Sequence, residues 1–487
     1  MESAPVEDLA AQAHDTHVVV VGGGIGGLVA AYACAKIGIR VTLVEASDRL
    51  GGALWTDEVG GLRVDLGAEG YATRGGGVRA LVDELGLAHV VAPTGPRAEW
   101  IGGLPGGPVQ LPAETVRGIP ENPWDERVRR LIGWRGAWRA YLDRLRPPLT
   151  IGQERSLGRL VRTRMGELVL DRVVAPLSLG AFCIHPDDVD VEAVAPGLSA
   201  ALTRTGSLSG AVSQLRAARA TASQPAGDGL DGLDGGMQHL VDALRERLRA
   251  LGAEVVVGVR VAGLRTHPGG RWTIEVDADS ARVIDPADHV IVATGAADAH
   301  RLLGRAAPAL EAMPVLALEV VTLVISSPEL TAAPPRSAVY AVAGRAVAAS
   351  VTDSTARWPW LRGEAGPDVH VLKVTFGAPG EVPATAALDD AAAADLAVAE
   401  ATALLGAKLE TVRGAHRARY LQPPPVSAIG HREAAEAARE AIHAVPGLAV
   451  VGAWVAGTGV AQVVPDALEE AERVRRIVLW GSAEKRP

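Results

Sequence analysis

Cysteine and lysine are both scarce in this chain of 487 residues. The two cysteines, Cys34 and Cys183, are too few for a disulfide framework and exclude a zinc or iron–sulfur site built from cysteine. The 12 histidines include no pair spaced along one helix face beside an acid, so we expect no metal site. Only 4 of the 48 basic residues are lysine, which indicates an arginine-rich coding bias rather than a special use of arginine.

The chain also has no excess of positive charge, because 57 acids against 48 bases give a net charge of -9. This balance argues against a nucleic-acid partner, for which a basic domain would be expected. With 48% apolar and 22% charged residues, the composition is that of a globular protein. The length predicts two or three domains and allows them to be discontinuous in sequence.

Neither a secretory signal nor a membrane-spanning helix is expected. Residues 1–15 are acidic and lack the basic start and apolar core of a signal sequence. Two uncharged runs, residues 18–35 and 444–464, are long enough to cross a membrane, but glycines interrupt both. We therefore expect a cytoplasmic protein, and peripheral contact with a membrane stays open.

The first fifty residues predict a strand, a helix and a second strand in succession. Residues 17–21 are short, apolar and β-branched, as in a buried parallel strand. Residues 26–37 predict a helix of small side chains, and residues 40–45 predict the second strand. Further strands are predicted at residues 255–264 and 448–454. The alternation of strands and helices is typical of an α/β protein.

The glycines between the first strand and helix carry a binding signal. Gly22, Gly24 and Gly27 take the three positions of G-x-G-x-x-G, which lets the backbone approach a pyrophosphate at the helix N-terminus. Glu45 ends the second strand 18 residues after Gly27, where an acid binds the ribose of an adenosine. The unit therefore predicts a dinucleotide-binding, Rossmann-like domain.

Further motifs extend this unit into a resemblance to a known family. Residues 45–52, Glu-Ala-Ser-Asp-Arg-Leu-Gly-Gly, resemble the extended FAD motif of the amine-oxidase and protoporphyrinogen-oxidase superfamily. Residues 65–74 resemble the D-x-G-x-E-x-x-x-x-R segment of coproporphyrinogen and protoporphyrinogen oxidases. The likeness is nearest to the oxygen-dependent coproporphyrinogen III oxidases of Gram-positive bacteria. Shorter matches lie at residues 81–87, 111–112, 118–120, 233–237, 419–431, 452–453 and 465–466.

The resemblance implies an α/β fold with a discontinuous Rossmann-like FAD-binding domain, a mixed-sheet substrate domain and a helical subdomain. It places the FAD-binding domain at residues 15–88, 226–305 and 429–480, the helical subdomain at 89–225 and the substrate domain at 306–428. The implied reaction is oxidation of coproporphyrinogen III to coproporphyrin III in haem biosynthesis, in which FAD accepts hydride and O2 reoxidises it to yield H2O2. A haem-pathway enzyme is a candidate partner, and the oligomeric state stays open.

The resemblance also implies a set of cofactor-binding residues. The phosphate-binding turn comprises Gly22, Gly23, Gly24, Ile25, Gly26 and Gly27. The extended motif adds Glu45, Ala46, Arg49 and Gly51, with Arg49 on the pyrophosphate. Val261 matches the position whose backbone contacts adenine. The remaining positions are Gly67, Ala68, Glu69, Gly70, Tyr420, Gly452, Gln462, Val463 and Val464.

Some segments depart from the family's pattern. Four extra residues follow Gly452-Ala453, so Val463 takes the place of a small residue beside the flavin. The insertion contains Gly457-Thr458-Gly459, which offers a replacement contact from a shifted position. In the substrate half, residues 177–184 and 334–345 also differ. Three other functions therefore stay open: a protoporphyrinogen IX oxidase, another flavin oxidase of amines or polyenes, and a homologue that binds FAD or a tetrapyrrole without turnover.

Arginine is the expected contact to the substrate. Coproporphyrinogen III carries four propionates against two in protoporphyrinogen IX, so its pocket needs more cations. Residues 89–225 and 306–428 contain many arginines, and we expect Arg74 to join them near the substrate and the flavin. We assign no other catalytic residue, because the flavin carries the chemistry in this family.

A tryptophan cluster stands in the most basic part of the chain. Trp124, Trp134 and Trp138 lie among the arginines of residues 127–139. The tryptophans fit a core or a protein interface, but also stacking on a tetrapyrrole or contact with lipid. The arginines fit a solvated face, the carboxylates of a substrate or anionic lipid headgroups. The sequence alone leaves these interpretations open.

Overall fold

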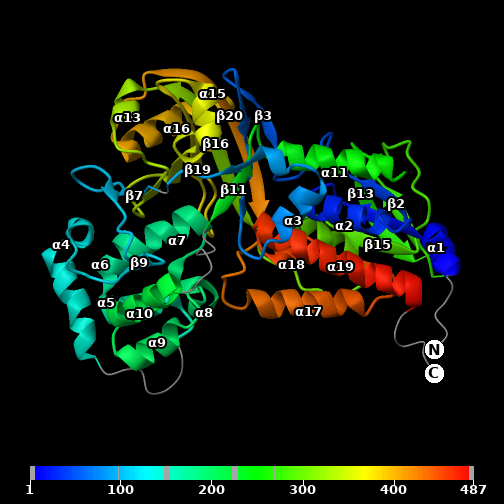
Figure 1. Cartoon of the computed structure of the whole chain (residues 1–487), viewed down its shortest axis with the longest axis horizontal. Helices are drawn as coiled ribbons and strands as arrows, with labels where there is room; N and C mark the ends of the chain where they lie inside the picture. Colours follow the sequence, from blue (N-terminus) through cyan, green and yellow to red (C-terminus); the bar gives the residue numbers. More distant parts are fainter. Residues whose placement is uncertain (1–5, 97, 147–153, 222–228, 267–269, 482–487) are drawn as a thin grey trace.

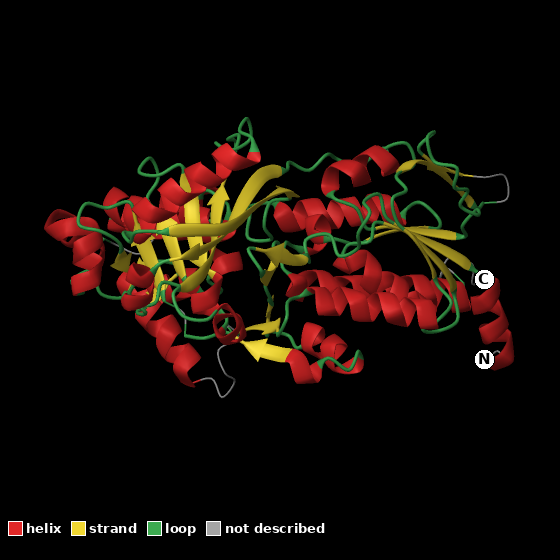
Figure 2. Cartoon of the chain, turned by 90° about the horizontal axis from the view of Figure 1, so that it is seen from above, coloured by secondary structure: helices red, strands yellow, loops and turns green. Residues whose placement is uncertain are grey.

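The computed structural model describes residues 6–96, 98–146, 154–221, 229–266 and 270–481. A five-stranded sheet with its helices forms one half of the molecule, and a seven-stranded sheet beside a group of helices forms the other (Figures 1 and 2). The predicted fold class is confirmed, because the smaller sheet is parallel and Rossmann-like and the larger one is mixed. The predicted domain boundaries stay a proposal.

The five-stranded sheet draws its strands from distant parts of the sequence. Its order is β12 (Glu254–Val256), β2 (Arg40–Val44), β1 (His17–Val21), β15 (His289–Val292) and β21 (Leu448–Val450). β1 is buried along its whole length, as expected for a parallel strand covered on both faces. On one face of the sheet, α2 (Ile25–Ala35) packs between α11 (Gln238–Ala250) and α19 (Val460–Trp480) (Figure 1).

The seven-stranded sheet is antiparallel except where β7 and β17 pair. Its order is β20 (Thr411–Gln422), β16 (Leu316–Ser326), β19 (Val369–Phe376), β18 (Ala348–Asp353), β17 (Ala338–Ala341), β7 (Glu99–Gly102) and β8 (Val109–Gln110). The alanine-rich helix α16 (Asp390–Leu405) buries its small residues against this sheet. The sheet thereby gains an apolar cover on one face.

A group of helices shares its own hydrophobic core beside the larger sheet. It comprises α4 (Glu126–Tyr141), α5 (Leu157–Met165), α6 (Glu167–Val169), α7 (Ala175–Phe182), α8 (Val191–Val194), α9 (Leu198–Thr205) and α10 (Leu208–Thr221). Side chains of β17, among them Tyr340, belong to the same core. The helical group therefore packs against the end of the seven-stranded sheet that β17, β7 and β8 form.

Shorter elements complete the described chain. The remaining helices are α1 (Val6–Asp15), α3 (Gly77–Glu84), α12 (Ala296–Leu303), α13 (Pro328–Ala332), α14 (Ser354–Arg357), α15 (Pro359–Ala365), α17 (His431–His443) and α18 (Ala453–Ala456). The remaining strands are β3 (Thr56–Val59), β4 (Leu62–Asp65), β5 (Tyr71–Ala72), β6 (Val91–Pro93), β9 (Thr115–Val116), β10 (Ile119–Pro120), β11 (Leu230–Leu233), β13 (Val261–Thr266) and β14 (Trp272–Val276). None of the described helices is both long and apolar enough to cross a lipid bilayer.

Two predicted strands are interrupted by glycines. The strand predicted at residues 255–264 is divided into β12 and β13, because Gly258 between them has a φ of +72°. The strand predicted at residues 448–454 stops at Val450, because Gly452 has a φ of +130° and α18 follows. Both glycines adopt a left-handed conformation that no strand continues through.

A buried ion pair joins the helices of the helical group. The side chains of Arg164 on α5 and Asp143 after α4 are only 2% and 1% exposed. Asp143 also accepts a hydrogen bond of 2.6 Å from the Leu208 N–H at the start of α10. The pair therefore ties three helices at one point, and removing one partner would leave a buried charge.

We expect Arg164→Met to lower the free energy of unfolding by about 3–5 kcal/mol, because Asp143 would stay buried without Arg164. The matched change Arg162→Met breaks the half-exposed pair of Arg162 with Asp187, and should cost at most about 1 kcal/mol. Denaturant unfolding followed by circular dichroism measures both values. Equal losses in the two variants would contradict the role given to the buried pair.

Candidate active site

The glycine turn between β1 and α2 depends on a close backbone approach. A Cβ on Gly27 would lie 2.0 Å from the carbonyl oxygen of Gly22, so only glycine lets α2 pack against this turn. Gly22 has a φ of +113°, which favours glycine as well. A Cβ on Gly24, by contrast, would meet no atom within 4 Å. The N-terminus of α2 therefore opens onto free space, where a pyrophosphate would meet the positive end of the helix dipole.

A cavity of 370 Å³ adjoins this turn at the carboxyl ends of β1, β2 and β15. Open parallel sheets bind their ligands at this edge. The Glu45 carboxylate is fixed there, since it accepts hydrogen bonds from the N–H groups of Gly23 (2.6 Å) and Ser47 (2.8 Å). The Gly51 N–H donates to the Gly23 carbonyl oxygen at 2.8 Å. Among the predicted cofactor residues, those that line the cavity are Gly22, Gly24, Glu45, Ala46 and Val261.

Val261 reaches this cavity beside an arginine that sequence reasoning missed. The Val261 side chain is buried in the core, and its carbonyl oxygen accepts a hydrogen bond of 3.1 Å from Arg301 Nη2. Arg301 Nη1 also donates to the Ala262 carbonyl oxygen at 2.7 Å. Arg301 on α12 and Val261 on β13 both line the cavity. An adenine contact through the Val261 backbone stays a prediction, and Arg301 would be its neighbour.

Arg49 lies beside the same turn with one nitrogen uncommitted. Its guanidinium stacks 4.3 Å from the ring centroid of Trp55, and Nη2 donates to the Gly52 carbonyl oxygen at 3.0 Å. Its Nη1 is buried and finds no hydrogen-bond partner among the described residues. A buried donor of this kind fits an anionic phosphate group. The unpaired Arg49 Nη1 and the open space at Gly24 together fit the pyrophosphate of a dinucleotide.

Glu69 links the predicted Gly67–Gly70 segment to the seven-stranded sheet. Its buried carboxylate forms an ion pair with Lys373 of β19 at 3.0 Å and accepts hydrogen bonds from Arg357 and Trp358 Nε1. Burial alone would raise the pKa of the Glu69 carboxyl, but Lys373 and Arg357 outweigh burial and bring that pKa to about 2. Glu69 is therefore ionised and serves to position this segment.

Neighbouring contacts fix the backbone of the same segment. Lys373 Nζ donates to the Gly67 carbonyl oxygen at 2.9 Å, and the Tyr420 hydroxyl of β20 donates to the Leu66 carbonyl oxygen at 3.1 Å. A Cβ on Gly67 would lie 1.9 Å from the Ala53 carbonyl oxygen, and the Ala68 N–H donates to that oxygen at 2.9 Å. Gly70 is equally confined, since its Cβ would clash with Asp231 and Trp358. Burial raises the pKa of Tyr420 to about 12, so its hydroxyl stays a donor.

The C-terminal segment differs from the arrangement expected from the resemblance. The predicted insertion after Gly452-Ala453 forms α18 and a turn through Gly457, where φ is +108°. Gln462 Oε1 accepts a hydrogen bond of 2.9 Å from the Gly459 N–H and so caps α19. Thr458, in this turn, lines the second cavity described below. Thr458 therefore lies at the larger cavity, and a contact from Gly457-Thr458-Gly459 to the flavin stays a prediction.

Val463 and Val464 lie inside the molecule rather than at a cavity. Val463 is 5% exposed, and its Cγ1 would be 3.1 Å from a Cβ on Gly26 of α2. Val464 is fully buried in the core shared by α2 and α19. Their side chains therefore pack the first turn of α19 against the glycine helix. The role predicted for Val463 beside the flavin stays a prediction.

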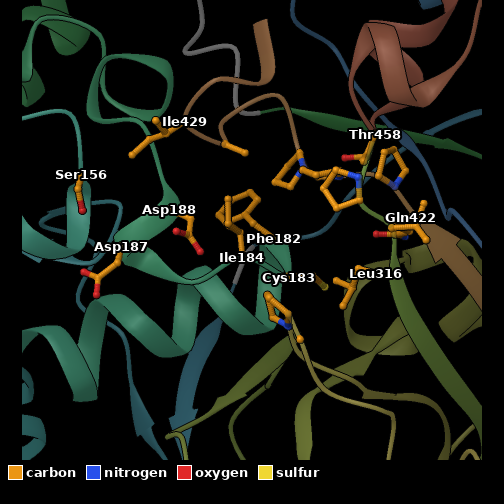
Figure 3. Close-up of a pocket in the computed structure, with 18 of the residues that line it drawn as sticks. Ser156, Phe182, Cys183, Ile184, Asp187, Asp188, Leu316, Gln422, Ile429 and Thr458 are labelled. Atoms are coloured by element: carbon orange, nitrogen blue, oxygen red, sulfur yellow. The ribbon is translucent and has the colours of Figure 1, made fainter. Parts of the chain in front are cut away.

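The second cavity, of 710 Å³, lies where the helical group, the seven-stranded sheet and the turn before α19 meet (Figure 3). Its walls are mostly apolar and include Phe182, Ile184, Leu316 and the three prolines after β20. Leu316 and Gln422 are paired neighbours at the ends of β16 and β20. A mostly apolar cavity of this size with a few polar groups is typical of a small-molecule site.

The charged side chains of this cavity are Glu154, Arg155, Arg159, Asp187 and Asp188. Arg155 forms ion pairs with Asp190 at 2.9 Å and Glu433 at 3.2 Å, whereas the Arg159 side chain forms none within the described residues. Arg159 therefore offers an uncommitted cation to a ligand. The cavity is thus lined by two cations and three anions. Two cations are fewer than the four propionates of coproporphyrinogen III would require.

The predicted Arg74 and the thiol of Cys183 can both be compared with this cavity. Arg74, the predicted substrate-side residue, lies on an exposed turn after β5 and is not among the residues that line the cavity. Cys183 does line it, but burial raises the pKa of its thiol to about 11. The thiol is therefore protonated near neutral pH and is a poor nucleophile. Sequence reasoning missed Arg155, Arg159 and Asp188, since no motif surrounds them.

We expect Gly24→Val to fold normally but to bind FAD weakly, because the new side chain would occupy the pyrophosphate space and meet no protein atom. Gly27→Val is the matched control, because its side chain would strike the Gly22 backbone and destabilise the fold itself. The flavin-to-protein absorbance ratio measures occupancy, and thermal unfolding without added FAD measures the fold. Full occupancy in Gly24→Val would disprove the assignment.

Sequence comparisons agree with this geometry. The profile of the family described as flavin containing amine oxidoreductase matches residues 25–478. The coproporphyrinogen III oxidase of Mycobacterium tuberculosis is 33% identical over 452 residues, which cover 91% of this chain and 93% of that protein. The coproporphyrinogen III oxidase of Propionibacterium freudenreichii subsp. freudenreichii is 29% identical over 503 residues, which cover 94% and 90%.

Solved structures show the same fold. A crystal structure from Exiguobacterium sp. 255-15 superposes with a TM-score of 0.80 at 23% identity and covers 95% of this chain and 99% of that one. The profile match extends from the glycine helix α2 nearly to the end of α19, and so includes the larger cavity and most residues that line the smaller one. The chain therefore belongs to the family of flavin-containing amine oxidoreductases.

Proposed function

We propose that this protein is an FAD-dependent oxidase that converts coproporphyrinogen III to coproporphyrin III in haem biosynthesis, with O2 as electron acceptor and H2O2 as product. The observation that carries the proposal is the 33% identity to coproporphyrinogen III oxidases over nine-tenths of both chains. A cavity of 710 Å³ beside the turn before α19 supports it, because a tetrapyrrole needs a large and mostly apolar space.

The residues proposed to bind FAD are those around the smaller cavity. The turn at Gly22–Gly27 would bind the pyrophosphate with Arg49, and Glu45 would bind the ribose. When bound, FAD would accept the hydride equivalents of the substrate and pass them to O2. The chain's own contribution is to bind the two reactants, orient them and exclude water.

The residues that line the larger cavity would orient the substrate rather than attack it as a nucleophile. Phe182, Ile184 and Leu316 form apolar walls that would exclude water from a pyrrole ring. Arg159, with no partner in the described part of the chain, would bind a propionate carboxylate. Asp188, which also lines the cavity, would accept a proton as the ring loses hydride to the flavin.

The charges of the cavity also support two alternatives. Only two arginines line the cavity, and Arg155 is already paired with two acids, so the cavity suits the two propionates of protoporphyrinogen IX better than four; this compound is the second candidate substrate. Three lining acids suit a cationic amine, which other members of this family oxidise and which is the third candidate. We propose coproporphyrinogen III first, because relatives with that name match more than nine-tenths of this chain.

We expect the purified protein to be yellow and to release porphyrin fluorescence from coproporphyrinogen III with concomitant H2O2. Protoporphyrinogen IX and a diamine, assayed at equal concentration, are the comparison substrates. The ratio of kcat/KM values for the two porphyrinogens decides between them. A ratio below one in favour of protoporphyrinogen IX would overturn the first proposal. A flavoprotein that oxidises none of the three would fit the interpretation of binding without turnover.

We expect Arg159→Gln to lower kcat/KM for coproporphyrinogen III by about 10- to 100-fold, through KM, because a charged hydrogen bond contributes about 1.5–3 kcal/mol. Arg204→Gln, an exposed arginine of α9 outside the cavity, is the control and should change little. Steady-state kinetics with both variants measures the effect. An unchanged KM in Arg159→Gln would show that this guanidinium does not bind the substrate.

A further inference from the structure

The larger cavity has a single aromatic side chain, Phe182, among the described residues that line it. Phe182 lies at the end of α7, and 41% of the residue is exposed within the cavity wall (Figure 3). The chain has only two phenylalanines, and the other, Phe376, is fully buried in the core beneath α16. Exposing a phenyl ring to water costs free energy, which a ligand that covers the ring would recover.

The backbone that carries this ring is held in an unusual conformation. Cys183, the next residue, ends α7 with a φ of +52°, which is unfavourable for any residue other than glycine. α7 also packs closely on β17, since a Cβ on Gly180 would lie only 2.7 Å from Cδ1 of Tyr340. The fold therefore places the Phe182 ring at one fixed point of the cavity wall.

An arginine lies against the same ring. The guanidinium carbon of Arg117 is 5.2 Å from the centroid of the Phe182 ring, and Arg117 Nε donates to the Val194 carbonyl oxygen at 3.0 Å. Arg117 also has a φ of +52°, so it and Cys183 are two of only three non-glycine residues with a left-handed backbone in the described chain. Strained positions of this kind are typical of ligand-binding sites.

The guanidinium and the candidate substrate space lie on different sides of Phe182. Arg117 lines a small, mostly apolar pocket behind the ring, and it does not line the larger cavity. This pocket has a volume of 20 Å³, which is enough for a water molecule but not for a pyrrole ring. Phe182 therefore marks the depth to which a substrate enters, with a cation behind it.

We propose that Phe182 is the stacking surface for a pyrrole ring of the substrate, and that Arg117 makes this surface selective for neutral, electron-rich rings. This role rests on the proposed function, since the pyrrole belongs to the tetrapyrrole. A cation on one side of a phenyl ring draws the π electrons toward itself, so the other face becomes less negative. An electron-rich pyrrole stacks well on such a face.

The same pair disfavours the amine among the candidate substrates. The acids of the cavity would attract an ammonium group, but at Phe182 it would meet the charge of Arg117 across the ring. Two cations on one ring compete for the same π electrons, so the second binds weakly. The ring and its arginine therefore select for a pyrrole and against an amine.

Titration of the full chain with coproporphyrin III, followed by the quenching of porphyrin fluorescence, tests the stacking. We expect Phe182→Leu, which keeps an apolar wall but removes the ring, to weaken binding about tenfold. Phe182→Tyr keeps the ring and is the matched control, which should stay within about twofold of the wild type. Arg117→Gln should weaken binding about threefold, whereas Arg117→Lys keeps the cation and should restore it.

Steady-state kinetics separates stacking from a structural role. In Phe182→Leu we expect KM for coproporphyrinogen III to rise, while the flavin occupancy and the unfolding temperature stay those of the wild type. Butane-1,4-diamine should inhibit Arg117→Gln at a lower concentration than the wild type, because the opposing cation is gone.

The outcomes distinguish this role from the proposed function. Equal binding of coproporphyrin III by the wild type and Phe182→Leu, or equal losses in Phe182→Leu and Phe182→Tyr, would overturn the stacking role and leave the proposed function standing. An Arg117→Gln variant no more sensitive to the diamine than the wild type would overturn the selectivity given to Arg117. A wild-type flavoprotein that neither binds coproporphyrin III nor oxidises coproporphyrinogen III would overturn the stacking role and the proposed function together.

Discussion

The buried carboxylate of Glu69 is the contact on which the relative placement of the two sheets depends. It lies on the segment that leaves β4, at the cofactor side of the molecule, and pairs with Lys373 in the middle of the larger sheet. Lys373 also donates to Gly67, and Tyr420 from the neighbouring part of that sheet donates to Leu66. Side chains of β19 and β20 thus contact this segment at Leu66, Gly67 and Glu69.

This arrangement explains why both cavities can serve one reaction. The smaller cavity belongs to the parallel sheet, whereas the larger one is shared by three units that have separate hydrophobic cores. A buried ion pair is a weak source of net stability but a strong source of geometry, since neither charge tolerates the loss of its partner. The segment at Glu69 therefore fixes the smaller cavity relative to the seven-stranded sheet that forms one wall of the larger cavity.

Local patterns predicted the strand–turn–helix unit beside the smaller cavity, but they did not predict which residues line the larger cavity. Gly22, Gly24, Gly27 and Glu45 are close in sequence, so the periodicity of one strand–turn–helix unit predicts their shared edge. Arg159 and Arg301 meet their cavities only through tertiary packing, and no spacing marks either of them. Val463 shows a third case, because counting along a motif cannot reveal that the inserted residues form α18 and a turn that brings Thr458 to the larger cavity.

The order of strands in the parallel sheet has a consequence for biosynthesis. β1 and β2 are made first, but β15 comes more than two hundred residues later and β21 only near the end of the chain. One side of the apolar helix α2 stays uncovered until α19 leaves the ribosome, because α19 packs against that side. Since domains fold as units during synthesis, this half cannot close on a nascent chain. A cofactor bound at this sheet would therefore be loaded after synthesis, and we expect a truncated chain that lacks α19 to leave one side of the apolar glycine helix exposed.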